Sequence, residues 1–350
     1  MTDTEDMNRE RHEARDALQQ VLYEIKRVIV GQDAMLERLL VSLLAGGHVL
    51  LEGVPGLAKT LTVKTLAASL GGSYGRIQFT PDLVPADLVG TRVWRPDTGS
   101  FDTELGPVFH NFLLADEINR APAKVQSALL EVMQEQQVTI GGTSYRVPAP
   151  FIVMATQNPI ESEGTYPLPE AQVDRFLMKI IVDYPSIGEE AAVVGRSLRD
   201  PADVRECLTL EDLRRHAAAT QTILVDREVI GYAVALADAT RHPEQHGLAD
   251  IKGLIEFGSS PRGPIGLVGA ARALALLRGR GHVETQDIRD LTPDLLRHRL
   301  VLSYDGLSEG VTADGLLDRV LAAVPEPGAQ RLMRAEDGER RAGGFMSAAG

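Results

Sequence analysis

The spacing of apolar residues along this chain changes several times. Over residues 8–29 they form one helical stripe, so we predict a lead-in helix there, followed by a second helix over 34–44 that Asp33 caps. Short apolar runs then predict buried strands, separated by segments at helical spacing. The predicted strands are 48–52, 76–80, 111–117, 151–156 and 177–182, and the predicted helices among them are 60–70, 121–135 with Pro122 in its first turn, and a short helix before residue 174. This alternation predicts an α/β fold, with a parallel sheet and helices on both faces.

Two further stretches have the pattern of β-hairpins. One pairs 88–94 with 100–105 around a turn at 95–99, and the other pairs 138–140 with 144–147 around 141–143. A βαβ unit needs only a helix between its strands, so the first hairpin is an insertion. It is either a contact for a partner or neighbouring subunit, or a surface excursion, and the two interpretations are equally good.

Beyond residue 185 the pattern is helical. The predicted helices are 210–221, 226–242, 264–279, 285–297 and 311–323. We therefore expect four parts: a lead-in helix over 1–29, an α/β core over 30–185, an all-helical lid over 186–323 and a flexible tail over 324–350, where Pro, Gly, Ala and charged residues dominate.

Composition narrows the choice of function. With 44% apolar residues the chain has enough material for real cores, and its net charge of −13 makes nucleic acid an unlikely partner. Cys207 is the only cysteine, which excludes a cysteine metal cluster and leaves it a structural or incidental role. No stretch has the length and apolarity of a membrane span, and the first residues do not resemble a signal peptide, so we expect a cytoplasmic protein.

The stretch from Gly53 to Thr60 carries the clearest chemistry. It fits the phosphate-loop pattern G-x-x-x-x-G-K-[ST] at Gly53, Lys59 and Thr60, with Ala58 in place of the second glycine. A predicted strand precedes it and a predicted helix follows. Ala58 is acceptable if its backbone is right-handed, because only a positive φ strictly needs glycine. Backbone N–H groups of such a loop bind phosphate oxygens, Lys59 places its charge on the β and γ phosphates, and Thr60 reaches Mg²⁺.

Polar residues follow two of the predicted strands. In a parallel sheet the carboxyl ends of the strands share one edge, so Asp116, Glu117 and Asn158 should lie near the loop. Asp116 is then expected to hold Mg²⁺ through water, Glu117 to orient or deprotonate the attacking water, and Asn158 to bind the γ-phosphate or that water. Two acids at the end of a strand, or an Asn-Pro turn, would each be weak evidence for a catalytic site without the phosphate loop.

Two other segments leave alternatives open. The turn Val30-Gly31-Gln32 just before the loop is either a wall for an adenine ring or a plain connector between helices. Ser260 suits the N-cap of a helix whose first position is Pro261, and Arg262 then needs an anionic neighbour. That neighbour is ATP phosphate or a surface carboxylate.

In this order the motifs resemble the MoxR family of AAA+ ATPases, over residues 18–323. The matching motifs are Val30-Gly31-Gln32, Gly56-Leu57-Ala58-Lys59-Thr60, Leu114-Ala115-Asp116-Glu117-Ile118-Asn119-Arg120, Ala155-Thr156-Gln157-Asn158-Pro159, Asp174-Arg175-Phe176 and Ser260-Pro261-Arg262. The resemblance implies an AAA+ core with a helix-2 insert and a pre-sensor hairpin, followed by a lid. It also implies a chaperone-like machine that matures or activates a protein complex, often with a von Willebrand factor A domain partner, although no motif names the client.

The resemblance assigns roles by residue. Lys59 and Thr60 resemble the Walker A pair, and Asp116 and Glu117 the Walker B pair. Asn158, Arg175 and Arg262 resemble sensor 1, the arginine finger and sensor 2. The finger implies a ring, usually a hexamer, while Arg262 is left to act in its own subunit or across the interface. The expected ATP-binding residues are Val30, Gly31, Gln32, Gly53, Val54, Pro55, Gly56, Leu57, Ala58, Lys59, Thr60, Leu61 and Asp116; the expected catalytic residues are Glu117, Lys59, Asn158, Arg175 and Arg262; the expected Mg²⁺ residues are Thr60 and Asp116.

Three other classes of function compete with a remodelling ATPase. A nucleotide-gated binding module would have the same motifs and slow turnover. A DNA motor of the minichromosome-maintenance type would share the two hairpins, but the acidic charge opposes it. A small-molecule P-loop kinase is the least favoured, because no acceptor motif stands out.

Overall fold

The chain divides into two compact units. A computed structural model describes residues 2–54, 56–159, 164–198 and 203–327. The first unit comprises Met1–Ile223 and Arg272–Gly281, and the second comprises Leu224–Ala271 and the residues from His282 onward. The lid boundary predicted near residue 185 stays a prediction. Most of the predicted tail, residues 328–350, lies outside the described residues.

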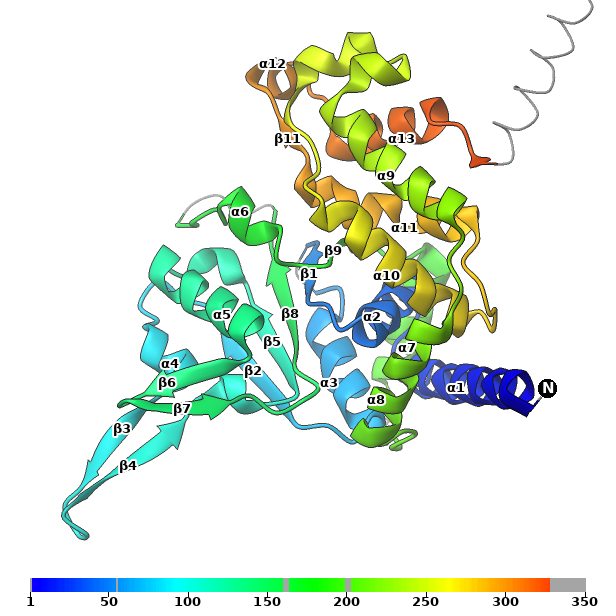
Figure 1. Ribbon diagram of the computed structural model, residues 1–350. Coiled ribbons are helices and arrows are strands. Elements are labelled where there is room, and N and C mark those ends of the chain that lie inside the picture. The colour runs from blue at the N-terminus through cyan, green and yellow to red at the C-terminus, as the bar shows by residue number, and fades with distance from the viewer. Residues whose placement is uncertain (1, 55, 160–163, 199–202, 328–350) are drawn as a thin grey trace, which may run out of the picture. The chain divides into compact units, whose positions relative to one another are not determined.

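A five-stranded parallel sheet forms the centre of the first unit. Its strand order is β2-β5-β8-β1-β9, with β1 Val49–Glu52, β2 Tyr74–Gln78, β5 Phe112–Asp116, β8 Ile152–Gln157 and β9 Met178–Ile181 (Figure 1). All five predicted strands are confirmed within a few residues. The inner strands read as unbroken apolar runs because helices cover both of their faces.

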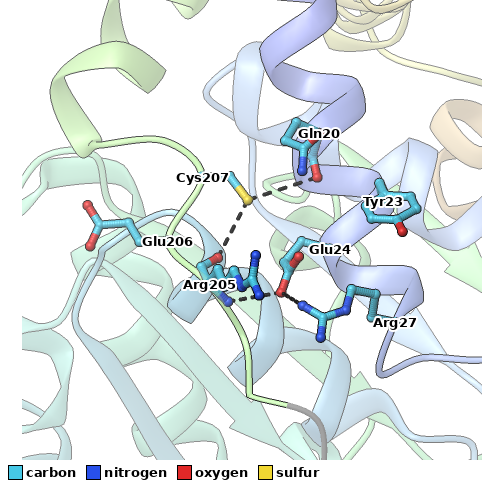
Figure 2. Close-up of a pocket in the computed structure, with 7 residues that line it drawn as sticks. All are labelled: Gln20, Tyr23, Glu24, Arg27, Arg205, Glu206 and Cys207. Atoms are coloured by element: carbon cyan, nitrogen blue, oxygen red, sulfur yellow. Dashed lines mark hydrogen bonds and ion pairs between the residues drawn. The ribbon is translucent and has the colours of Figure 1, made fainter.

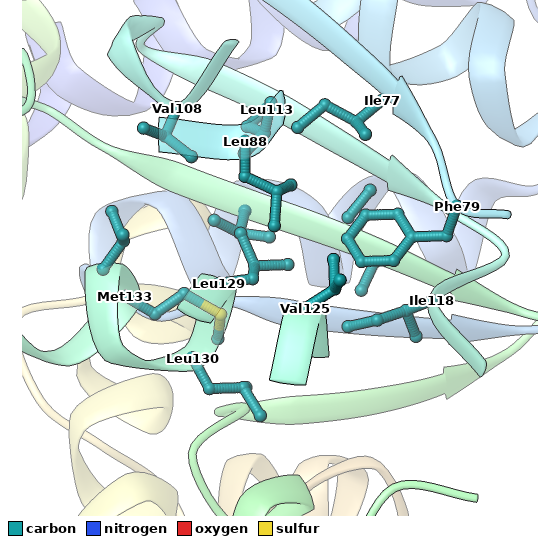
Figure 3. Close-up of a cluster of buried hydrophobic side chains, with 14 of the residues drawn as sticks. Ile77, Phe79, Leu88, Val108, Leu113, Ile118, Val125, Leu129, Leu130 and Met133 are labelled. Atoms are coloured by element: carbon teal, nitrogen blue, oxygen red, sulfur yellow. The ribbon is translucent and has the colours of Figure 1, made fainter. Parts of the chain in front are cut away.

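Eight helices are described in this unit outside α10. They are α1 Thr2–Lys26, α2 Asp33–Leu44, α3 Lys59–Ser69, α4 Pro85–Val89, α5 Ala123–Glu135, α6 Glu170–Val173, α7 Ile187–Ser197 and α8 Leu210–Ala219. Helix α5 covers one face of the sheet, and α2, α3 and α8 lie beyond the opposite face (Figure 1). On the α5 face, fully buried Phe79, Leu113 and Leu129 belong to one apolar cluster that joins sheet and helix (Figure 3). Burial of each such side chain contributes about 1.5–3 kcal/mol.

Both predicted hairpins are present. The first is β3 Gly90–Arg95 with β4 Ser100–Leu105, and the second is β6 Gln137–Ile140 with β7 Thr143–Arg146. The first extends away from the sheet (Figure 1). The hairpins touch each other, since the Tyr145 hydroxyl donates to Thr103 Oγ1 at 3.1 Å.

As far as the structure describes it, the second unit is helical apart from one short pair of strands. Its helices are α9 Arg227–Arg241, α11 Thr285–Leu296, α12 Tyr304–Ser308 and α13 Ala313–Ala323, and α10 Arg262–Leu277 is divided between the two units. The antiparallel pair is β10 Ile255–Phe257 with β11 Val301–Leu302. Strands of two or three residues are too short to show an alternating pattern, so the sequence did not predict them.

Several predicted helix ends are wrong. Asp33 is not the cap of α2 but its first residue, and the cap is Gln32 in the left-handed conformation, φ 58° and ψ 29°, without a side-chain hydrogen bond. Pro122 is the N-cap of α5 rather than part of its first turn. Pro261 precedes α10, while Ser260 Oγ does accept a hydrogen bond from the Arg262 N–H at 3.2 Å. Helices α4, α7 and α12 were not predicted.

His48 joins three elements of the core. It stands just before β1, its Nδ1 accepts from the Val153 N–H of β8 at 3.0 Å, and its Nε2 lies 3.2 Å from the Met133 carbonyl oxygen of α5. Nε2 must therefore donate, and the ring is neutral. Burial lowers the pKa of His48 from 6.5 to about 4.

We expect His48 to make the fold acid-sensitive. Between pH 6.5 and about 4 the unfolded chain binds a proton at this residue that the folded chain does not. The stabilisation is therefore fully present above pH 6.5 and declines as the pH falls, by about 3 kcal/mol in all. Urea unfolding at a series of pH values should give a shallower decline for His48→Gln, whose amide keeps one donor and one acceptor. Parallel curves for the two proteins would contradict this assignment.

Candidate nucleotide site

The predicted phosphate loop connects β1 to α3. Gly53 starts it, and a Cβ there would lie 2.5 Å from the Val182 carbonyl oxygen, so only glycine fits. The Lys59 ammonium donates to the Gly53 carbonyl at 2.6 Å and folds back over the loop. Gly56 has a φ of 87°. Pro55 lies outside the described residues.

The expectation for Ala58 is wrong. Its backbone is left-handed, with φ 56° and ψ 16°, where a Cβ costs about 1–2 kcal/mol. Gln32 and Glu117 share this conformation and were also predicted as site residues; the fourth non-glycine residue with positive φ in the described chain is Gln136. Backbone strain of this kind is found mostly at functional sites, and it persists only where the surrounding contacts hold the residue in the unfavourable conformation.

One cavity of about 340 Å³ brings most predicted residues together. It is lined by Gly56, Leu57, Ala58, Lys59, Thr60, Leu61, Asp116, Glu117, Thr156 and Asn158. Lys59 and Thr60 come from the start of α3, the two acids from the end of β5, and Asn158 from the residue after β8. Of the predicted ATP-binding residues that are described, Val30, Gly31, Gln32, Gly53 and Val54 do not line it.

A hydroxyl group that the sequence did not single out joins the two acids. Thr156 Oγ1 donates to Asp116 Oδ1 at 2.7 Å and accepts from the Glu117 N–H at 2.8 Å. The other oxygen of Asp116 accepts from the Arg76 guanidinium at 2.7 Å. Thr156 was within reach of sequence reasoning, because it precedes Asn158 by two residues on a strand beside β5. Arg76 was not, since nothing local distinguishes it from a surface arginine.

The Glu117 carboxylate is also engaged. Its Oε2 accepts from Gln78 Nε2 at 2.8 Å and from the Arg120 guanidinium at 3.1 Å. Gln78 was missed, although it ends β2 next to Asp116 in the strand register. These two donors hold the Glu117 carboxylate in place.

Lys59 sits among three carboxylates. Burial lowers its pKa, and the charges of Asp116, Glu117 and Glu52 oppose that shift. The first-turn N–H groups of α3 have no acceptor within the helix, so this end of the cavity presents donors and a cation opposite two acids. Such a site suits a phosphate group together with a divalent cation.

The other predicted residues lie outside the cavity. Gln32 Nε2 donates to the Asp183 carbonyl at 3.0 Å, and a Cβ on Gly31 would collide with the Glu189 carboxylate. Arg175 is half-buried, after α6, and does not line the cavity in its own chain. Arg262 begins α10 and belongs to the second unit.

A second cavity, of about 380 Å³, contains none of the predicted site residues. It lies between one side of α1 and residues 205–207 (Figure 2). Its buried carboxylate, Glu24, accepts from Arg27 at 2.6 Å and from the Arg205 N–H at 3.0 Å. Burial raises the pKa of the Cys207 thiol, which keeps it protonated and weakly reactive.

A strand, a phosphate loop and a helix, with two acids at the end of another strand of the same parallel sheet, define a P-loop nucleotide-binding protein. Two protein-family models match the chain in agreement: the ATPase family associated with various cellular activities (AAA) at residues 48–178, and the AAA lid domain at residues 249–320.

Comparison with related proteins shows the family to which the chain belongs. The chain is 56% identical to Chaperone MoxR1 of Mycobacterium tuberculosis over 310 residues, 89% of this chain and 82% of that protein. It is 36% identical to Protein MoxR of Paracoccus denitrificans, over 86% of this chain and 94% of that protein. A crystal structure of a Cytophaga hutchinsonii protein, 43% identical, superposes with a TM-score of 0.88 over 93% of this chain and 99% of that chain. The chain belongs to the MoxR family of AAA+ ATPases.

No helix in the described part of the chain is long and apolar enough to cross a membrane.

Proposed function

We propose that this ATPase binds Mg·ATP in the cavity beside the phosphate loop and hydrolyses it at subunit interfaces of a ring. The observation that carries the proposal is the cavity itself, in which Lys59, Thr60, Asp116, Glu117 and Asn158 meet from three separate segments. Their side chains are the ones that phosphoryl transfer to water requires: a cation, two metal-facing oxygens, a base and an amide.

Each residue then has one task. Lys59 neutralises charge on the β and γ phosphates, and Glu117 orients the attacking water and receives its proton. Asn158 donates to the γ-phosphate or to that water. The Thr60 hydroxyl and the Asp116 carboxylate suit Mg²⁺, which prefers oxygen ligands and keeps several waters, so two protein groups suffice. Val30, Gly31 and Gln32 would face the adenine ring.

The position of Arg175 supports a ring. It lies outside its own chain's cavity, as expected for a residue that completes a neighbour's site. A hexamer is the proposed size. Arg262 is proposed to sense the γ-phosphate, in its own site or a neighbour's.

The biological role is proposed from the family. The name of the M. tuberculosis relative, Chaperone MoxR1, favours remodelling, maturation or activation of a protein complex. We propose a cytoplasmic machine that works with a von Willebrand factor A domain protein on a client that the site does not define.

A slow, nucleotide-gated module is the second candidate. The hydrogen bonds that hold Glu117 to Gln78 and Arg120 favour it, because a carboxylate held this way activates water poorly until it is released. A DNA motor has less support, given the net charge of −13.

Calorimetric titration with Mg·ATP tests the nucleotide site. Lys59→Ala should weaken binding about 10- to 100-fold, the value of a charge-assisted contact of roughly 1.5–3 kcal/mol. Lys64→Ala, an exposed lysine on the same helix, is the matched control and should bind like the wild type. Equal affinity for all three proteins would place ATP elsewhere.

A further inference from the structure

A buried glutamine joins the catalytic turn to the segment that leads to Arg175. Gln126 lies on α5 and is fully buried. Its Nε2 donates to the Ile118 carbonyl at 3.1 Å and to the Tyr166 carbonyl at 2.9 Å. Since both partners are carbonyl oxygens, only the NH₂ side of the amide can face them, and the orientation of the side chain is defined.

The two carbonyls belong to different parts of the machinery. Ile118 directly follows Glu117 and begins a single 3₁₀ turn, Ile118–Arg120. Tyr166 belongs to the segment after Asn158, and its N–H donates to the Asn119 carbonyl of that turn at 2.6 Å. Gln126 therefore clamps the segment at Tyr166 onto the turn that carries Glu117.

A second hydrogen bond ties the same segment to α5 shortly before Arg175. Gln172, on α6, donates from Nε2 to Ser127 Oγ at 3.2 Å, and the Arg175 N–H donates to the Gln172 carbonyl at 3.2 Å. Phe176, which follows, is fully buried in the core. The backbone of Arg175 is thus fixed on both sides, through residues that begin at the Glu117 turn.

Stability alone does not explain a glutamine at this position. Within the described residues, Gln126 Oε1 is buried without a hydrogen-bond partner, and so are Asn119 Oδ1 of the Glu117 turn and Gln172 Oε1 of α6. Each such oxygen carries a desolvation penalty that a methionine of similar volume would avoid. What the amide adds is a fixed position of the segment at Tyr166 relative to the turn that follows Glu117.

We propose that Gln126 is a positioning residue that sets the place of Arg175 relative to the Glu117 turn, and so links the state of one active site to the finger offered to the next subunit. The proposal rests on the proposed role of Arg175 in the neighbour's site. Without the clamp, Glu117 and the phosphate loop stay intact while the segment leading to Arg175 loses its register. A displacement of about 1 Å at a catalytic group lowers turnover about 10²-fold.

Mixing experiments separate this role from a defect in the subunit's own site. Gln126→Met should lower ATP turnover about 10²-fold with unchanged ATP binding, whereas Gln134→Met, on the exposed side of α5, should not. A mixture of Gln126→Met with Glu117→Gln, whose Arg175 is intact, should hydrolyse ATP faster than the sum of the rates of the two separate preparations. Mixed with Arg175→Ala, Gln126→Met should regain no activity.

The outcomes are distinguishable. Rescue of Arg175→Ala by Gln126→Met would place the defect in the subunit's own site and overturn the proposal, and so would wild-type turnover of Gln126→Met. Arg175→Ala mixed with Glu117→Gln is the reference pair. If this mixture regains no activity, Arg175 does not act in the neighbour's site, and the role proposed for Gln126 is then wrong as well. If Gln126→Met does not fold, Gln172→Met, which removes the tie to Ser127, takes its place with the same expectations.

Discussion

Replacing Arg175 by alanine is expected to lower ATP turnover by about 10³- to 10⁵-fold, the contribution of an arginine supplied to the transition state of phosphoryl transfer. ATP affinity should change little, because Arg175 does not line the cavity of its own chain. The reason is geometric: among the described residues that line this cavity Lys59 is the only cation, so charge on the transferring group needs a second source. Steady-state ATPase assays alongside ATP titrations measure both quantities.

Arg214→Ala is the matched control for that variant. Arg214 is exposed on α8 and lies on the same unit, so its loss should leave turnover unchanged. An Arg175→Ala protein that hydrolyses ATP like the control would remove Arg175 from the reaction.

Replacing Glu117 by glutamine is expected to lower turnover by about 10²- to 10⁴-fold while ATP still binds, because the amide keeps the shape of the carboxylate but cannot accept a proton. The Glu117 backbone is anchored by its N–H bond to Thr156 Oγ1, so the substitution should not disturb the loop. Single-turnover measurements with bound ATP separate the chemical step from binding.

Glu131→Gln supplies the comparison, since Glu131 is exposed on α5. If Glu117→Gln turned over at the rate of this control, another group would have to be the base. Loss of ATP binding in Glu117→Gln would instead assign the residue to the binding of nucleotide and metal.

Strand positions and the phosphate loop were predictable, because they depend on short-range patterns. Continuous apolar runs mark strands buried on both faces, and the Lys59-Thr60 pair after Gly53 marks the loop. Because the carboxyl ends of parallel strands share one edge of the sheet, Asp116, Glu117 and Asn158 could be predicted to lie together, and they line one cavity.

The features that the sequence did not predict depend on tertiary contacts. The left-handed backbone of Ala58 is imposed by the fold against the residue's own preference. Arg76 and Gln78 reach the acids from a strand about 40 residues earlier, and no spacing rule links them. Gln126 resembles any polar position of an amphipathic helix until its two carbonyl partners are known. The lid boundary and the roles of Arg175 and Arg262 stay predictions.

The most direct test of the central claim is the ATPase rate per subunit as a function of protein concentration, for the wild type and for Arg175→Ala. A ring with a finger in trans predicts a wild-type rate that climbs with concentration and a variant that stays near zero throughout. A wild-type rate that is the same at every concentration, and that Arg175→Ala retains, would contradict catalysis between subunits.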